Sequence, residues 1–369
     1  MNRKHLGILV AGLAVLAVAA LALPPLLHKR APEAVHVIRI GAPVVSGTTS
    51  TQTYFGSVGV ARVKHLFERE FEKDGIKVEF VGFPNGPMVA QALANNQIDF
   101  AGHGDMISII ARAGGAKTRL ILPSQRFSNA YLVVPPGSPI HSVEDLRGKR
   151  VAYTKGNYIH LQTLRILEEH GLKESDIRSV NLAPAAVAAA VRAGQVDAVF
   201  ANADILLLVE QGLARVAYST RGRPDLGGRS AVLVRDQFAT ENPELTARVV
   251  KVLVQASRYA SEEQRRDEVL GIWATGRAVG PLRTENEGVP MAEIVSPLLD
   301  PFYIEGYRRT EADVQKLGLL RGEPFEIEDW VDRTYLDKAL KDLGLEHYWT
   351  PRPAGPPSAS AAAPASVAK

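Results

Sequence analysis

The sequence predicts an α/β fold with two lobes of similar design that face one cleft. Residues 79–110 (EFVGFPNGPMVAQALANNQIDFAGHGDMISII) alternate short apolar, β-prone runs with runs of helical spacing. Residues 191–198 (VRAGQVDA) repeat the pattern of residues 93–100 (LANNQIDF): a helix end, a Gln, a β-branched residue, an Asp and an apolar strand. With 369 residues, the chain is long enough for two domains of roughly 150 residues each.

The remaining elements follow from the same patterns in chain order. Helical spacing runs from residue 60 to residue 71 and ends at Asp74-Gly75, which is a stop signal. Residues 135–139, bounded by prolines, are a candidate crossover between the lobes. Asn242-Pro243-Glu244 opens a helix in the preferred order of cap, proline and acid, and helices follow to about residue 345. We expect strands at residues 35–42, 78–83, 98–101, 120–123, 130–134, 150–154, 180–182, 196–200, 214–219 and 231–234.

Composition excludes several classes of protein. Hydrophobic residues make up 46% and charged residues 22% of the chain, as in an ordinary globular protein. The formal net charge is +3, and it falls to +3 − 2 = +1 without Arg3 and Lys4 of the N-terminal leader. No block of lysine and arginine occurs, so nucleic acid is not an expected partner. The absence of cysteine excludes disulfides, thiolate nucleophiles and cysteine-based metal sites.

The two ends of the chain differ from the rest. Residues 6–23 are almost entirely Leu, Ala, Val, Ile and Gly after a short basic start, and Pro24-Pro25 ends them. We interpret residues 1–30 as an export signal, with a retained inner-membrane anchor at residues 6–23 as the alternative, since about 20 apolar residues span a bilayer. Either interpretation places the bulk of the chain in the periplasm. Residues 351–369 are Pro, Ala and Ser, and we expect a disordered tail.

Corners between a strand and a helix are the candidate binding positions. Helix N-termini at such corners present unpaired N–H groups to the crevice above an α/β sheet, and glycine lets a ligand approach the backbone. The corner that ends at Gly104-Asp105 is one example, although Asp105 is also a common N-cap residue. Lys155-Gly156-Asn157 suits an anion such as a sulfonate, a carboxylate or a phosphate. A capped helix beside a solvent-exposed lysine is the alternative.

No pattern of a known catalytic site occurs. The sequence contains no GxSxG elbow, no HExxH and no Walker-type phosphate loop. His103 and His160 each lie at a proposed corner without metal-ligand spacing to another histidine. Arg126 and Arg229 could add charge to the cleft, although each is more simply a surface arginine. We therefore expect no catalytic residue, no metal and no cofactor.

At these corners the chain resembles a known family, the periplasmic substrate-binding proteins of ABC importers of the aliphatic sulfonate, taurine and nitrate type. The resemblance covers residues 37–345. It rests on residues 79–87 (EFVGFPNGP), Ile98-Asp99-Phe100 with Gly104-Asp105, residues 142–152 (SVEDLRGKRVA), Lys155-Gly156 with His160, residues 194–198 (GQVDA) and Asn242-Pro243-Glu244.

The resemblance implies a two-lobed fold of the type II periplasmic binding-protein kind, with two crossover strands and a ligand cleft between the lobes. It implies lobe I at residues 36–134 and 231–345, and lobe II at residues 135–230. The ligand would be a small organic anion, delivered by a monomer to an ABC permease in the inner membrane. The residues expected to contact the ligand are Gln52, Tyr54, Gly104, Asp105, Met106, Lys155, Gly156, Asn157, Tyr158, His160, Asn202, Asp204 and Arg229.

Two other functions stay open. One is an enzyme or binder of the pyrimidine-precursor type on the same scaffold, although the leader argues against a cytoplasmic enzyme. The other is a membrane-tethered accessory protein or sensor that uses residues 6–23 as an anchor. A cationic or neutral heterocyclic ligand also stays open, because Asp105 and Asp204 could both face the cleft.

Overall fold

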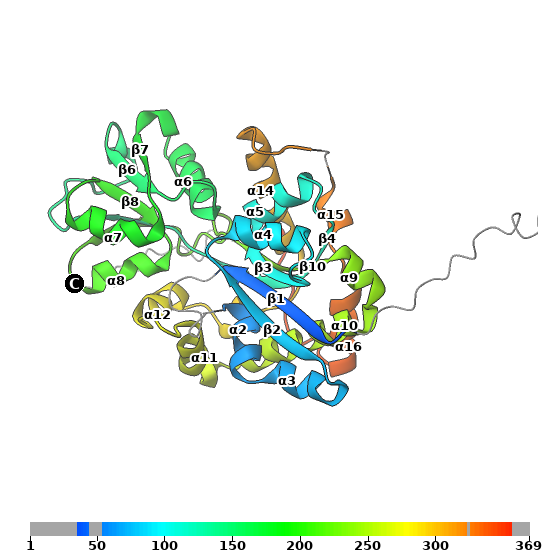
Figure 1. Cartoon of the computed structure of the whole chain (residues 1–369). Coiled ribbons are helices and arrows are strands. Elements are labelled where there is room, and N and C mark those ends of the chain that lie inside the picture. Colours follow the sequence, from blue (N-terminus) through cyan, green and yellow to red (C-terminus); the bar gives the residue numbers. More distant parts are fainter. Residues whose placement is uncertain (1–34, 44–53, 323–324, 356–369) are drawn as a thin grey trace, which may run out of the picture. The chain divides into compact units, whose positions relative to one another are not determined.

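The fold contains two β-sheets with helices, shown in a computed structural model of the chain (Figure 1). The described residues are 35–43, 54–322 and 325–355. All of the described elements lie within the unit His36–Lys369. The expected leader at residues 1–30, most of the loop at residues 46–55 and most of the C-terminal tail lie outside the described residues.

The first sheet defines the first lobe. Its strand order is β2 (Lys77–Phe83), β1 (Val37–Pro43), β3 (Phe100–Gly104), β10 (Ser230–Arg235) and β4 (Thr118–Gln125). Strand β1 is parallel to both β2 and β3, whereas β10 is antiparallel to both β3 and β4. The late strand β10 is therefore inserted between strands formed much earlier in the chain.

The second sheet defines the second lobe and repeats this plan. Its strand order is β7 (Arg178–Asn181), β6 (Arg150–Tyr153), β8 (Ala198–Ala201), β5 (Tyr131–Val134) and β9 (Arg215–Ser219). Strand β6 is parallel to β7 and β8, whereas β5 is antiparallel to β8 and β9. In each sheet, the fourth strand in this order is the antiparallel one. This shared order confirms the expected α/β class with two lobes of similar design.

The chain passes between the sheets twice. It leaves β4 for β5 through residues 126–130, which we call the first connector, and returns from β9 to β10 through residues 220–229, the second connector. The crossover expected at residues 135–139 was wrong, because β5 already pairs with β8 and β9. The expected limit of lobe I at residue 134 thus differs from the limit of the first sheet by one strand.

The helices lie between and around these strands. The α-helices are α2 (Gly56–Val63), α3 (Leu66–Phe71), α4 (Gly86–Ala94), α5 (Asp105–Ala113), α6 (Tyr158–Glu169), α7 (Pro184–Arg192), α8 (Leu206–Glu210), α9 (Asp236–Glu241), α10 (Pro243–Ala260), α11 (Arg266–Trp273), α12 (Gly280–Asn286), α13 (Met291–Ile294), α14 (Pro301–Lys316), α15 (Ile327–Trp330) and α16 (Thr334–Leu343). Short 3₁₀ helices are η2 (Glu72–Asp74), η3 (Glu144–Leu146), η4 (Glu174–Asp176), η5 (Ala203–Ile205) and η6 (Glu263–Arg265).

Side-chain caps begin several of these helices. The Oδ1 atoms of Asn85, Asn157 and Asp300 accept hydrogen bonds from backbone N–H groups in the first turns of α4, α6 and α14. The expected cap at Asn157 is thereby confirmed. The single helix expected at residues 60–71 was wrong, because His65 takes a left-handed conformation (φ 52°) and separates α2 from α3.

The second lobe shows why its strands read as continuous apolar runs. Alternate residues of β5 belong to different apolar clusters: Leu132 and Val134 pack with one, Tyr131 and Val133 with the other. Both faces of the sheet are therefore buried, as parallel-type sheets covered by helices require.

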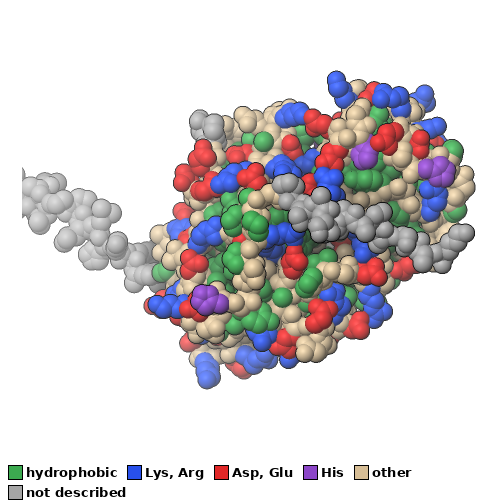
Figure 2. Space-filling model, turned by 180° about the vertical axis from the view of Figure 1, so that it is seen from behind, with side chains coloured by type: hydrophobic (Ala, Val, Ile, Leu, Met, Phe, Trp, Pro, Cys, Tyr) green, Lys and Arg blue, Asp and Glu red, His purple; other side chains and the backbone are tan. Residues whose placement is uncertain are grey.

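The surface carries charged side chains of both signs (Figure 2). Seen from behind, Lys and Arg side chains are interspersed with Asp and Glu over the face shown in Figure 2. No helix of the described residues is long and apolar enough to cross a membrane. Across the described ranges, no three His, Asp or Glu side chains form a group that could hold a metal ion.

Candidate ligand-binding site

Two corners of the second lobe come together at the first connector. Asn157 caps α6, so Tyr158 is the first residue of that helix, while Asn202 caps η5 after β8. Burial raises the pKa of Tyr158 to about 12, and hydrogen bonds from Ser128 and Asn202 to its hydroxyl oppose that rise. Ser128 belongs to the first connector, so this contact joins both corners of the second lobe to the passage between the sheets.

The first lobe contributes the N-terminus of α2. Its cap position is Phe55, which offers no side-chain hydrogen bond, and its first turn contains no acidic residue. The first N–H groups of such a helix carry a partial positive charge and favour an anion. Ser57 in this turn is buried, and its Oγ has no hydrogen-bond partner among the described residues. The N-terminus of α2 thus has polar groups available for a ligand.

Gly56 fixes the position of this helix end. Its φ is +60°, and an added Cβ would lie 2.0 Å from the backbone oxygen of Ser124 at the end of β4. From the other side, Trp273 Nε1 donates a hydrogen bond to Gly56 O at 3.1 Å. Only glycine can accept both the left-handed conformation and this close approach.

Arg277 connects the two lobes at this point. Its Nη1 donates to Asp204 Oδ1 at 2.6 Å, and its Nη2 donates to Trp273 O at 2.9 Å. The guanidinium carbon lies 4.9 Å from the centre of the Phe55 ring. The Arg277 Nε atom is buried and has no partner among the described residues. We call this arrangement the lobe junction; its members are Phe55, Ser57, Ser128, Tyr158, Asn202, Asp204 and Arg277.

Helix α12 packs against η5, which contains Asp204 of the lobe junction. Glu285 on α12 accepts hydrogen bonds from Asn129 N at 2.8 Å and from the Tyr131 hydroxyl at 2.5 Å. Burial raises the pKa of the Glu285 carboxyl, and the hydrogen bond from Asn129 N opposes that rise. Glu285 therefore attaches the segment that carries Arg277 to the first connector.

The corner at Gly104-Asp105 has a different role. Gly104 is the cap residue and Asp105 the first residue of α5, so the expectation of Asp105 as a plain N-cap was wrong. Asp105 is buried, and its Oδ2 accepts a hydrogen bond from Thr310 Oγ1 on α14 at 3.0 Å. Burial raises the pKa of Asp105, and the charges of Arg165 and Arg229 oppose that rise. Met106 packs in a small apolar cluster with Leu161, Val314, Ile110 and Leu320.

Both arginines that we expected at the surface are buried instead. Arg126 Nη2 pairs with Asp300 Oδ2 at 2.6 Å. Arg229 donates to Gly227 O at 2.9 Å and stacks 4.6 Å from the Phe302 ring centre. Burial lowers the pKa of Arg229 to about 10. These contacts attach both connectors to α14. They also explain why the two arginines are buried, because each has partners for its charged group inside the protein.

At the Lys155 corner, Lys155 and His160 have partners within the second lobe, whereas Gly156 has open space around it. Lys155 Nζ pairs with Glu174 Oε1 at 2.6 Å and donates to Ser179 Oγ at 3.2 Å, within its own lobe. Gly156 has φ +83° with open space around it, and its N–H donates to His160 Nδ1 at 3.4 Å. Burial lowers the pKa of His160, which stacks on Tyr153. Of the residues expected here, the structure brings Tyr158 and its cap Asn157 to the lobe junction.

The loop before α2 is only partly described. Gln52 lies outside the described residues. Tyr54 is buried against Phe80, with ring centres 5.3 Å apart, and burial raises the pKa of Tyr54 to about 12. Two open surface pockets lie elsewhere: one of about 660 Å³ beside Arg119 and Trp330, and one of about 730 Å³ beside Arg283 and Glu287.

Sequence reasoning missed Ser57, Ser128, Arg277 and Glu285. Arg277 and Glu285 lie in the helical part of the expected lobe I, after Asn242-Pro243-Glu244, and no motif surrounds them. A local signal existed for Ser57, since it closely follows Gln52 and Tyr54, two of the expected ligand contacts. Ser128 lies in a connecting loop that contains no recognisable motif.

Comparison with known proteins identifies the family of this chain and the proteins that share its fold. Residues 53–266 match the family described as NMT1/THI5 like. A periplasmic sulfonate-binding protein, SsuA from Methylobacillus flagellatus KT, superposes with a TM-score of 0.78 at 30% identity, over 88% of this chain and 99% of that one. A protein of Bacillus subtilis (strain 168) that is named for binding aliphatic sulfonates is 28% identical over 77% of this chain and 84% of its own length.

An enzyme also shares the fold. The desulfurization enzyme DSZB has a TM-score of 0.66 at 18% identity, over 83% of this chain and 99% of that one, which shows a common fold and no more. The more similar proteins above are named as binding proteins, and the two-lobed α/β fold is that of the SsuA proteins. Since the family match spans more than half of its residues, the chain belongs to the NMT1/THI5-like family.

Proposed function

We propose that this protein is the solute-binding component of an ABC import system and that it captures a small organic anion, most simply a sulfonate, at the lobe junction. The names of its relatives support the ligand class. The position of the junction supports the site, because it joins both sheets through the first connector and α12.

The observation that carries this proposal is the position of the Arg277 guanidinium beside Phe55, the residue at the cap position of α2. A guanidinium has five N–H donors in a planar fork that matches the oxygens of a sulfonate or carboxylate, and Arg277 uses only some of them. The N-terminus of α2 adds uncapped N–H groups. Asp204 holds Arg277 in this structure, and we propose that the anion takes over part of this contact.

Hinge closure would couple binding to transport. A ligand that contacts both lobes binds the closed arrangement better than the open one, so it shifts the population toward closure. Closure also removes water, which strengthens each charged contact. We propose that the closed, monomeric protein then delivers the anion to a membrane permease.

Export belongs to the same proposal. We propose that residues 1–30 direct the chain to the periplasm, where its relative from Methylobacillus flagellatus KT is placed by name. Sequencing the N-terminus of the mature protein distinguishes a removed signal from a retained anchor.

A binding experiment with matched variants tests the ligand class. Calorimetric titration in a sulfonate-free phosphate buffer compares alkanesulfonates, taurine, nitrate, carboxylates and pyrimidines. We expect a sulfonate to bind, and Arg277→Gln to weaken binding at least about tenfold, since a hydrogen bond to a charged group contributes about 1.5–3 kcal/mol. Arg283→Gln is the control, because Arg283 is exposed on α12 and its ion pair within the described residues is with exposed Asp267. Binding of pyrimidines alone, or equal loss in both variants, would contradict the proposal.

A further inference from the structure

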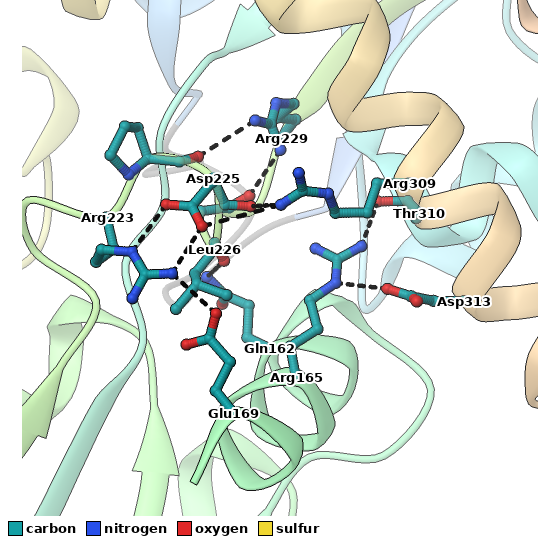
Figure 3. Close-up of polar contacts among 12 residues, drawn as sticks. Gln162, Arg165, Glu169, Arg223, Asp225, Leu226, Arg229, Arg309, Thr310 and Asp313 are labelled. Atoms are coloured by element: carbon teal, nitrogen blue, oxygen red, sulfur yellow. Dashed lines mark hydrogen bonds and ion pairs between the residues drawn. The ribbon is translucent and has the colours of Figure 1, made fainter. Parts of the chain in front are cut away.

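Helix α6 connects the lobe junction to a second contact between the lobes. Its first residue, Tyr158, lies at the junction. Leu161, Arg165 and Glu168 follow at spacings of four and three residues, which places them on one face of the helix. This face contacts α14, an element of the first lobe, as Figure 3 shows for Arg165. One rigid helix therefore takes part in both contacts.

The contact between α6 and α14 combines charged and apolar pairs. Arg165 Nε donates to Asp313 Oδ2 at 2.5 Å, and its Nη2 donates to Thr310 Oγ1 at 3.2 Å (Figure 3). Leu161 packs with Val314 in the cluster that includes Met106. Lys316 Nζ pairs with Glu168 Oε1 at 2.8 Å on the exposed side. The charges are complementary, with α6 supplying Arg then Glu and α14 supplying Asp then Lys.

The two ion pairs differ in exposure. The side chains of Arg165 and Asp313 are 10% and 29% exposed, whereas those of Lys316 and Glu168 are 67% and 70% exposed. Exposed pairs contribute little because water and salt screen them. The Arg165–Asp313 pair must therefore supply most of the electrostatic stabilisation of this face.

Gln162 lies between these two contacts and binds both connectors. Its Nε2 donates to Ser128 O at 2.7 Å and to Leu226 O at 2.9 Å, and the side chain is buried. Figure 3 shows the contact with Leu226. The helix is thus attached at the point where the chain passes between the lobes. A rotation of the second lobe about the connectors must move both ends of α6 relative to the first lobe.

We propose that the face formed by Leu161, Arg165 and Glu168 on α6 and by Thr310, Asp313 and Val314 on α14 is a latch that stabilises the arrangement in which the lobe junction is formed. Both contacts are present in one structure, so each favours the same arrangement of the lobes. Arg165 and Asp313 then set the affinity for a ligand that neither touches. This inference rests on the proposed function only for its affinity measurement.

Charge reversal and charge exchange test the latch. Arg165→Asp should weaken ligand binding about tenfold, in the range of ordinary coupling between sites. The exchange Arg165→Asp with Asp313→Arg should restore affinity, which a purely structural loss at Arg165 would not allow. Lys316→Glu is the matched control and should change affinity little, because that pair is exposed. Thermal unfolding of each variant confirms that it folds, and Arg165→Met provides a neutral variant if the reversal does not.

A second readout needs no ligand. The chain contains no cysteine, so single cysteines at Lys73 in the first lobe and Gln195 in the second can be spin-labelled specifically. Both positions are exposed. In the ligand-free protein, Arg165→Asp should broaden the distribution of label-to-label distances, and the exchange variant should restore it.

The outcomes separate the two proposals. If no compound of the panel binds, the proposed function fails while the distance distribution still decides the latch. An unchanged distribution in Arg165→Asp, or an affinity that rises, would overturn the latch, since the face would then be either permanent or specific to the open arrangement.

Discussion

Each lobe has an aspartate at the amino end of its central strand, and the two aspartates make matching contacts. Asp99 before β3 exchanges backbone and side-chain hydrogen bonds with Arg39 of β1, and Asp197 before β8 does the same with Arg150 of β6. The repeated sequence pattern therefore marks a structural device: a carboxylate that ties the central strand to its neighbour. Repetition in the sequence identified a part of the scaffold.

The carboxyl ends of the same strands differ. Asp105 after β3 is buried and bound to Thr310, whereas Asp204 after β8 is 40% exposed in its side chain and pairs with Arg277 at the lobe junction. The first lobe buries its acidic corner under α14, while the second lobe keeps its corner available. Similar strand order thus leaves the two lobes free to divide packing and binding between them.

The largest effect is expected where the shared aspartate is most buried. Asp99→Ala should lower the free energy of unfolding by about 3–5 kcal/mol, because it leaves Arg235, whose side chain is 15% exposed, without its ion-pair partner. Asp197→Ala should cost only about 1 kcal/mol, since its partner Arg150 is 43% exposed and water can replace the pair. Urea denaturation of both variants measures the difference. Equal losses would show that the two aspartates are equivalent after all.

Glycines before two helices offer the next comparison. Gly56→Ala should destabilise the protein by about 3 kcal/mol, because a left-handed residue and a clash with Ser124 O combine. Gly156 is also left-handed but has open space around it, so Gly156→Ala should cost about 1–2 kcal/mol. Thermal unfolding tests the ranking. A smaller cost at Gly56 would mean that the end of β4 can move away from α2.

Because the first lobe contains a buried histidine, its stability should fall in acid. Burial lowers the pKa of His103 to about 4 from 6.5. The unfolded chain therefore binds a proton that the folded chain does not between pH 6.5 and pH 4, and stability falls as the pH falls through this window. The loss approaches about 3 kcal/mol at pH 4.

His103→Leu should remove this pH dependence, whatever it costs at pH 7. Ala201 occupies the matching position in the second lobe, four residues after Asp197, and cannot titrate. Free energies of unfolding measured at pH 7, 6, 5 and 4 provide the test. A slope that persists in the variant would assign the acid sensitivity to another group.

Much of the fold was predictable from the sequence. Runs of β-branched residues, the Asn157 cap and the repeat around Asp99 and Asp197 act locally, so their signals lie within a few residues of the elements they form. The order of the strands in each sheet has no such local signal. The pairing of β5 with β8 and β9 depends on contacts between distant segments, so the crossover expected at residues 135–139 lies one strand after the observed connector at residues 126–130.

The candidate site was less predictable, for a physical reason. Tyr158, Asn202 and Asp204 were found because strand ends and helix starts are visible in the sequence. Arg277 and Glu285 come from the helical segment after α10, and only the tertiary fold brings them to the first connector. A lone arginine or glutamate in a helical pattern gives no indication of where it will be buried.

The shared donor at Gln162 limits how the lobes can move. Two independent linkers would let one body bend, twist and slide relative to the other. Here one amide holds the carbonyl groups of both Ser128 and Leu226, so the two linkers must deform together. Any displacement of one linker alone would have to break one of these two hydrogen bonds.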